Sequence, residues 1–168
     1  RTASLIFTEI PGLPGADKGQ EAIEARLTGL GMSLQEVIRV PHDTAALAQA
    51  LTGAEGEIVL ILTASATSDA RDVAPTALSG AGGRPTRFGL PVDPGNLLFF
   101  GQLGERPVIG LPGSARSPVL HGADWVLARI ACGLPVTDEE IAAMGVGGLL
   151  KEIPTRPQPR QRPQGPSS

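Results

Sequence analysis

The chain has 168 residues and a net charge of −3, and hydrophobic residues make up 41% of it, which is enough for one domain with a packed core. The acidic balance, the aromatic content of only 3% and the absence of tyrosine argue against binding to nucleic acid, which needs basic and stacking side chains. A single cysteine excludes an internal disulfide, and no apolar run approaches the ~20 residues of a membrane span, so we expect a cytoplasmic protein.

The first eighty residues alternate apolar runs of strand length with segments in which apolar residues recur at helical spacing. The run EIVLILT at residues 57–63 is apolar throughout its middle, which is typical of a strand covered on both faces in a parallel sheet. His42 stands just before a helix cap at Asp43 and is expected to be structural. Strands are predicted at residues 4–10, 34–40 and 57–63, and helices at residues 17–31, 43–53 and 72–81.

The next part of the chain is predicted to be extended. A strand is expected at residues 84–92, and the residues DPGN at 93–96 have the composition of a tight turn. Two further strands, at residues 97–103 and 107–111, are expected to form a hairpin.

A long helix is expected to run from Pro118 to residue 133, because proline is favoured in the first helical turn. Val119 falls on its apolar stripe, whereas His121 falls opposite the stripe and is expected to be exposed. Cys132 is expected to fill space as a small apolar side chain.

Alternating strands and helices predict an α/β domain with three layers, α/β/α, and a mostly parallel sheet over residues 1–153. Within it, Thr137 and Glu140 form the capping box of a short last helix. Residues 154–168 are rich in Pro, Gln, Arg and Ser and are predicted to be a linker or disordered tail. Because the chain begins at Arg1 rather than at a methionine, we expect it to be part of a longer protein.

The segment TASATSDARD, residues 63–72, joins the apolar strand to the next helix and is rich in small hydroxyl residues. At such a junction small side chains allow a ligand close to the backbone, and free N–H groups at the helix start favour anions. The alternative is a polar loop with an ordinary helix cap at Asp72. Similarly, Asp69 and Asp72 would suit Mg²⁺ together with nucleotide oxygens, or they are simply solvated or paired with Arg71.

A second such junction is GLPGSARS, residues 110–117. Arg116 is the natural partner for a phosphate there, and the alternative is a helix entry with a surface arginine. Residues 91–96 are either a hairpin turn or a third wall of the same site. Because parallel strands end at a common edge of the sheet, we expect these segments to converge on one pocket.

Three segments resemble, in order and spacing, motifs of the molybdopterin-binding domains of molybdopterin adenylyltransferases and molybdopterin molybdenumtransferases. Residues 63–77, TASATSDARDVAPTA, resemble TGGTG-x-x-x-RDVTP-x-A, and residues 110–117 resemble GLPGNPVS. Residues 92–101, VDPGNLLFFG, resemble a KPGKPLAFG-like segment. The resemblance covers residues 4–135 and is strongest to the molybdopterin-binding domain fused ahead of a nucleotidyltransferase-like domain in some bacterial proteins.

The resemblance implies binding of molybdopterin, or of its adenylylated or cytidylylated form, in molybdenum cofactor biosynthesis or handover. It implies a catalytic role for Asp72, which would also hold Mg²⁺ with a nucleotide. It also implies self-association as a dimer or trimer. A nucleotidyltransferase-like domain, fused or separate, is the partner that it implies. The cofactor-binding residues that it implies are Thr63, Ser65, Thr67, Ser68, Asp69, Arg71, Pro94, Gly95, Gly110, Pro112, Gly113, Ser114, Arg116 and Ser117.

The chain departs from the family pattern at the loop glycines and at two lysines. Ala64, Ser65 and Thr67 replace glycines, so Cβ atoms narrow the space for a phosphate, and Asp93 and Asn96 replace lysines. Candidates to supply the missing positive charge are Arg71, Arg87 and Arg116. Three functions remain open: a binding domain, a Mg-ATP-dependent adenylyltransferase or molybdenum-insertion domain, and a scaffold that binds no ligand.

Overall fold

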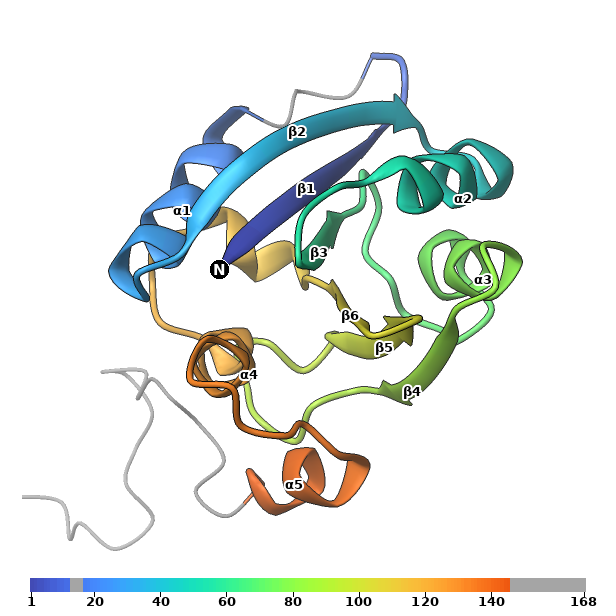
Figure 1. Ribbon diagram of the computed structural model, residues 1–168. Helices are drawn as coiled ribbons and strands as arrows, with labels where there is room; N and C mark the ends of the chain where they lie inside the picture. The colour runs from blue at the N-terminus through green and yellow to red at the C-terminus, as the bar shows by residue number, and fades with distance from the viewer. Residues whose placement is uncertain (13–16, 146–168) are drawn as a thin grey trace, which may run out of the picture.

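The computed structural model describes residues 1–12 and 17–145, which form a six-stranded sheet with helices on both faces (Figure 1). The strands are β1 (Thr2–Glu9), β2 (Ser33–Pro41), β3 (Ile58–Leu62), β4 (Arg84–Phe88), β5 (Phe99–Leu103) and β6 (Arg106–Gly110). The helices are α1 (Asp17–Gly29), α2 (Thr44–Gly53), α3 (Val73–Gly80), the 3₁₀ helix η1 (Gly113–Arg116), α4 (Gly122–Ala131) and α5 (Asp138–Ala143).

The strand order is β2-β1-β3-β6-β5-β4, and the first four of these strands are parallel to one another. β5 and β4 are added antiparallel through the hairpin between β6 and β5. The predicted three-layer α/β/α domain with a mostly parallel sheet is therefore confirmed. β1, β2, β3 and β6 all end at one edge of the sheet, which we call the carboxyl edge, and they begin at the opposite, amino edge.

Both faces of the sheet are covered, as the apolar run of β3 predicts. Figure 1 shows α1 and α4 on one face and α2 and α3 on the other. Side chains alternate along each strand between the two cores: Leu5 and Phe7 pack in the core beneath α1 and α4, whereas Ile6 packs beneath α2 and α3. Burial on both faces explains why the central strands are apolar without alternation.

Two predicted helix caps are confirmed. Asp43 accepts hydrogen bonds from the N–H groups of Ala45 and Ala46 at the start of α2. Thr137 and Glu140 form a reciprocal capping box at the start of α5. These short polar side chains satisfy donors that a helix leaves unpaired at its first turn.

The predicted start of the long helix is wrong. The chain forms η1 and then an extended segment, and α4 begins only at Gly122. His121, predicted to be exposed, is instead 1% exposed and caps α4, because its Nδ1 accepts the N–H of Ala123. Val119, predicted to be inward, is 46% exposed because it precedes the helix, and Cys132 is exposed at the helix end instead of filling space.

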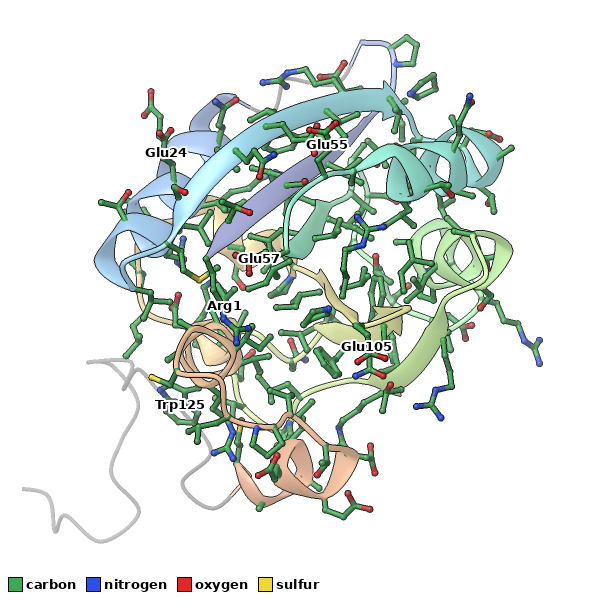
Figure 2. The ribbon with its side chains drawn as sticks, viewed as in Figure 1. Arg1, Glu24, Glu55, Glu57, Glu105 and Trp125 are labelled. Carbon is green, nitrogen blue, oxygen red and sulfur yellow. The ribbon has the colours of Figure 1, made fainter. Side chains whose placement is uncertain are left out.

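β4 is shorter than predicted, because the chain leaves the regular ladder at Gly89, which has a φ of +89°. The boundary predicted at residue 153 and the linker predicted at residues 154–168 lie outside the described residues. Within residues 1–12 and 17–145, no helix is long and apolar enough to cross a membrane. Glu57 and Glu105, labelled in Figure 2, lie at the amino edge of the sheet, where Glu57 accepts the N–H of Thr2 at 2.8 Å.

Candidate functional site

The two predicted ligand segments lie side by side at the carboxyl edge. β3 and β6 are neighbours in the sheet, so the loop after β3 (residues 63–72, the first loop) and the loop after β6 (residues 111–117, the second loop) start next to each other. A hydrogen bond of 2.9 Å from Arg116 Nη2 to the carbonyl oxygen of Thr63 joins them. The first and second loops therefore meet at one edge of the sheet, as expected, whereas the convergence of all three segments on one pocket stays a prediction.

Arg116 lies partly buried between the two loops and the start of α1. Its side chain crosses Gly19, where a Cβ atom would come within 3.2 Å of Arg116 Cγ and 2.9 Å of Leu62 Cδ2, so a larger residue would push the arginine away. Burial lowers the pKa of the Arg116 guanidinium from its ordinary value. Within the described residues, Arg116 Nη1 and Ser114 Oγ are both buried without a hydrogen-bond partner. An unpaired guanidinium N–H such as that of Arg116 Nη1 suits an oxyanion.

Asp72 occupies the cap position of α3, but its carboxylate turns back into the first loop. Its Oδ2 accepts the N–H of Ser68 at 2.7 Å and the N–H of Asp69 at 3.0 Å, and no side chain caps α3. These two N–H groups, Ser68 first, lower the pKa of Asp72. These bonds thus favour the charged form of the carboxylate and fix the shape of the loop, while no side chain caps the first N–H groups of α3.

Asp69 accepts the backbone N–H of Arg71 at 2.7 Å, while the Arg71 side chain is exposed. No group of three or more His, Cys, Asp or Glu side chains that could hold a metal occurs among residues 1–12 and 17–145. The predicted Mg²⁺ site needs only one or two carboxylates with nucleotide oxygens, so it stays a prediction.

The four hydroxyl residues of the first loop divide into two kinds. Thr63 and Thr67 are buried, and Thr63 Oγ1 donates to the carbonyl oxygen of Ser65 at 2.6 Å, so these two side chains shape the loop. Ser65 and Ser68 are exposed. No described residue other than glycine has a positive φ, so the replacement of the family glycines, including that by Ala64, strains no backbone here.

His42 belongs to this site, although the sequence analysis assigned it a structural role only. It follows β2 at the carboxyl edge, and its Nδ1 lies 2.7 Å from Thr8 Oγ1 while its Nε2 lies 3.0 Å from Ser65 Oγ. The signal that identifies it is its position directly after a parallel strand. It carries no local motif, because its partners are 34 and 23 residues away in the chain.

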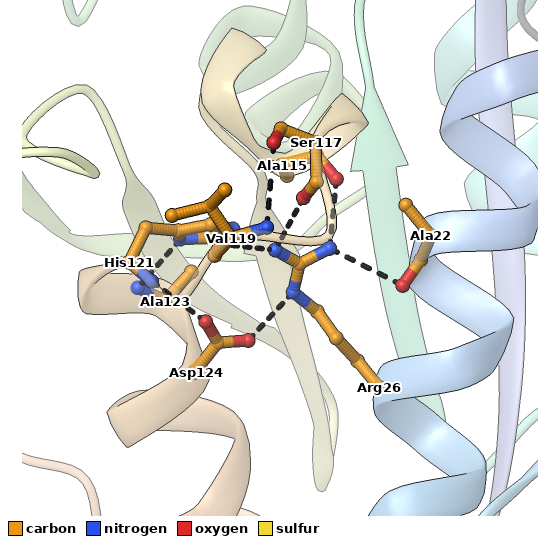
Figure 3. Close-up of polar contacts among 8 residues, drawn as sticks. All are labelled: Ala22, Arg26, Ala115, Ser117, Val119, His121, Ala123 and Asp124. Atoms are coloured by element: carbon orange, nitrogen blue, oxygen red, sulfur yellow. Dashed lines mark hydrogen bonds and ion pairs between the residues drawn. The ribbon is translucent and has the colours of Figure 1, made fainter.

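Arg26 of α1 holds the second loop in place, which no sequence pattern indicated. Figure 3 shows its guanidinium among the carbonyl groups of that segment: it donates to Ala115 O at 2.9 Å, Ser117 O at 2.6 Å and Val119 O at 2.9 Å. Its Nε also bonds to Asp124 Oδ1 at 2.6 Å. The loop that carries Ser114 and Arg116 is therefore built on α1 and α4.

The predicted third wall lies at the same edge, since Phe99 at the start of β5 pairs with Gly110 at the end of β6. The turn packs against the start of α4: Gly122 N–H donates to Pro94 O at 2.8 Å. Gly95 has a φ of +118°, and a Cβ there would lie 2.7 Å from Gly122 N. This turn therefore touches the start of α4, which follows the second loop.

Most of the remaining predicted site residues pack against or bond to other parts of the protein. Gly110 lies against the Phe99 ring and Pro112 is buried, whereas Gly113 faces open space. Ser117 supplies a carbonyl oxygen to Arg26, and its hydroxyl accepts the N–H of Val119 at 3.3 Å. Arg87 pairs with Asp138 at 2.7 Å, so it does not supply charge to the two loops.

Comparison with known proteins places the chain. Among solved structures, the molybdopterin biosynthesis MoeA protein of Pyrococcus horikoshii is 22% identical with a TM-score of 0.48, over 67% of this chain and 30% of that one. The CinA protein of Thermoplasma acidophilum is 17% identical with a TM-score of 0.48, over 77% and 95% of the two chains. The molybdopterin biosynthesis enzyme MoaB of Thermus thermophilus is 14% identical with a TM-score of 0.48, over 88% and 98%.

The chain thus spans less than a third of the length of the first of these proteins. A search of curated proteins finds no significant match. The profile of the family described as "Probable molybdopterin binding domain" matches residues 6–130, which is more than half of the chain and includes both loops. The chain therefore belongs to this molybdopterin-binding domain family.

Proposed function

We propose that this domain binds molybdopterin, or its adenylylated or cytidylylated form, between the first and second loops at the carboxyl edge. Membership of the family supports a molybdopterin-related ligand in molybdenum cofactor biosynthesis. The observation that carries the proposed location is Arg116, which joins the two loops through Thr63 and whose Nη1 has no hydrogen-bond partner among the residues that the structure describes. A phosphate of the ligand would supply the acceptor that Arg116 Nη1 lacks.

The start of α3 supports the same location. Because Asp72 bonds within the first loop rather than to the helix, the first N–H groups of α3 are left without a side-chain cap. Free N–H groups and the helix dipole favour an anion at that end. Arg116 and the start of α3 would thus attract the anionic ligand in place of the lysines that the family has at the positions of Asp93 and Asn96.

The domain would hold the cofactor or its precursor in the cytoplasm while a nucleotidyltransferase-like domain acts on it. That domain would be fused beyond residues 154–168 or supplied as a partner, and residues 1–153 would form a dimer or trimer. These features are proposed on the resemblance of the three loop segments to the family motifs.

A second candidate is catalysis by the domain itself, as a Mg-ATP-dependent adenylyltransferase or in molybdenum insertion. The observation that favours it is the carboxylate of Asp72, held in place by the N–H groups of Ser68 and Asp69, which favour its charged form and lower its pKa. Such a carboxylate would orient a metal–nucleotide complex, and backbone donors would stabilise charge on the transferred phosphoryl group. Transfer of AMP to the pterin phosphate in vitro, lost in Asp72→Asn, tests this candidate.

Calorimetric titration with molybdopterin, and with inorganic pyrophosphate as a probe of the anion site, tests the binding proposal. We expect Arg116→Gln to weaken binding by about tenfold or more, the loss typical of a hydrogen bond to a charged group, and Arg116→Lys to weaken it less. Arg84→Gln on β4, an exposed arginine far from both loops, is the matched control and should leave binding unchanged.

Folded wild-type protein that gives no heat with either compound contradicts the proposal. The scaffold alternative then predicts a stable oligomer by light scattering whose melting temperature no small ligand shifts.

A further inference from the structure

A row of three hydrogen bonds runs from the interior to the surface of the first loop. The N–H of Ala64 donates to Thr8 Oγ1 at 2.9 Å, Thr8 Oγ1 lies 2.7 Å from His42 Nδ1, and His42 Nε2 lies 3.0 Å from Ser65 Oγ. Thr8 is 2% exposed, whereas Ser65 is exposed. The three hydrogen bonds thus connect Thr8 on β1, His42 after β2 and the first loop in one chain at the carboxyl edge.

The available donors and acceptors determine which group donates in each of these hydrogen bonds. Thr8 Oγ1 already accepts from Ala64, and among the described residues its own proton has one acceptor within reach, His42 Nδ1. Because a buried hydroxyl keeps its proton hydrogen-bonded, Thr8 donates to Nδ1. A neutral imidazole with an accepting Nδ1 carries its proton on Nε2, so His42 donates to Ser65. The hydroxyl proton of Ser65 then has no acceptor among the residues that the structure describes.

We propose that Thr8 and His42 aim the hydroxyl of Ser65 outward as a donor to a phosphate oxygen of the bound ligand. Ser65 would contact the ligand, and Thr8 and His42 are positioning residues. The inference rests on the proposed function, and it explains how a serine at a family glycine position serves an anion site: the side chain takes space but supplies a directed, uncharged donor.

One observation and two general properties of hydrogen bonds support this geometry. The backbone at Ser65 is fixed independently, because Thr63 Oγ1 donates to its carbonyl oxygen at 2.6 Å. Hydrogen bonds arranged head to tail also polarise one another, so the terminal hydroxyl becomes a better donor than an isolated serine. A donor held in position before binding loses little freedom when the ligand arrives.

The first test is the tautomer of His42 in the ligand-free protein, read by long-range ¹⁵N–¹H NMR at about pH 8, where an ordinary histidine is neutral. The chain has two histidines, and His121, whose Nδ1 accepts the N–H of Ala123, is the internal reference for a proton on Nε2. We expect the same tautomer for His42, a mixture of tautomers in Thr8→Val and the wild-type pattern in Thr8→Ser. A proton on Nδ1 in the wild type makes Ser65 the donor to His42 and overturns the proposal.

The second test is binding of inorganic pyrophosphate and of molybdopterin by calorimetry. Ser65→Ala should weaken binding about tenfold, as the loss of one hydrogen bond to a charged group does, and Thr8→Val should weaken it in the same direction although its side chain is buried. His42→Ala should weaken binding, and His42→Gln, which keeps a donor near Ser65, should restore part of it. Thr52→Val on α2 removes a threonine hydroxyl that bonds only to Ala48 O, and it should change nothing.

Thermal unfolding confirms that each variant is folded before titration. Wild-type binding that neither Ser65→Ala nor Thr8→Val weakens refutes this inference and leaves the proposed function intact. Wild-type protein that binds neither compound refutes the proposed function and the role of Ser65 with it.

Discussion

Replacing Arg26 with methionine tests whether the second loop depends on α1. The Arg26 side chain is 9% exposed and that of its partner Asp124 is 17% exposed, with 2.6 Å between Nε and Oδ1. The guanidinium also serves four carbonyl oxygens, of which Ala115, Ser117 and Val119 supply three (Figure 3). Methionine fills much of the same volume but donates no hydrogen bond.

The expected loss of unfolding free energy in Arg26→Met follows from the burial of the ion pair. Removing one partner of a buried ion pair costs about 3–5 kcal/mol, because the other charge stays buried and unpaired. The exposed end of the site, at Val119, lets water reach part of the freed carbonyl groups, so we place the loss for Arg26→Met near the lower value, about 3 kcal/mol. Since small domains are stable by about 5–15 kcal/mol, the variant should remain folded at room temperature.

A second ion pair with the same N–O distance but more exposed side chains shows how much of the loss is due to burial. Arg129 and Glu140 are also 2.6 Å apart, but their side chains are 32% and 31% exposed, so Arg129→Met should cost no more than about 1 kcal/mol. Urea unfolding measures both losses, and hydrogen exchange of the amides at residues 114–121 reports the loop itself. Equal costs for the two variants, or unchanged protection of that segment in Arg26→Met, would refute the reasoning.

Two further predictions concern the loops. Gly110→Ala should destabilise the fold by about 1–3 kcal/mol in urea unfolding, because its methyl group would lie 1.9 Å from the Phe99 ring, whereas Gly113→Ala, with nothing within 4 Å, should be near neutral; similar losses would contradict this. The carboxyl group of Asp72 should titrate below its ordinary value of 3.8 in ¹³C NMR, because the N–H of Ser68 favours the charged form, and this lowers its pKa. Its stabilisation is then present above the unfolded-state pKa and lost as the pH falls through the lower folded-state pKa, and a midpoint above 3.8 would contradict that.

Much of the fold could be predicted from local patterns. The strands and helices of the first eighty residues follow from apolar spacing and from caps such as Asp43, because each signal lies within the element that it predicts. The meeting of the first and second loops could also be predicted, since it requires only that β3 and β6 be parallel neighbours.

The rest depends on contacts between distant parts of the chain. Pro118 is typical of a helix start, but Arg26, 91 residues before Ser117, binds the carbonyl groups of this segment and keeps it extended until His121 caps α4. His42 has no motif, and only its place beside β1 and the first loop gives it partners. No sequence window of helical length contains either relation.

The reversal of direction at β6 has a practical consequence. The turn between β5 and β6 lies at the amino edge, and Glu105, labelled in Figure 2, is exposed there, opposite to both loops. A cysteine introduced at Glu105, with the exposed Cys132 changed to serine, gives one attachment point for a fluorophore or a sensor surface. The domain can thus be immobilised with its ligand loops directed toward the solution.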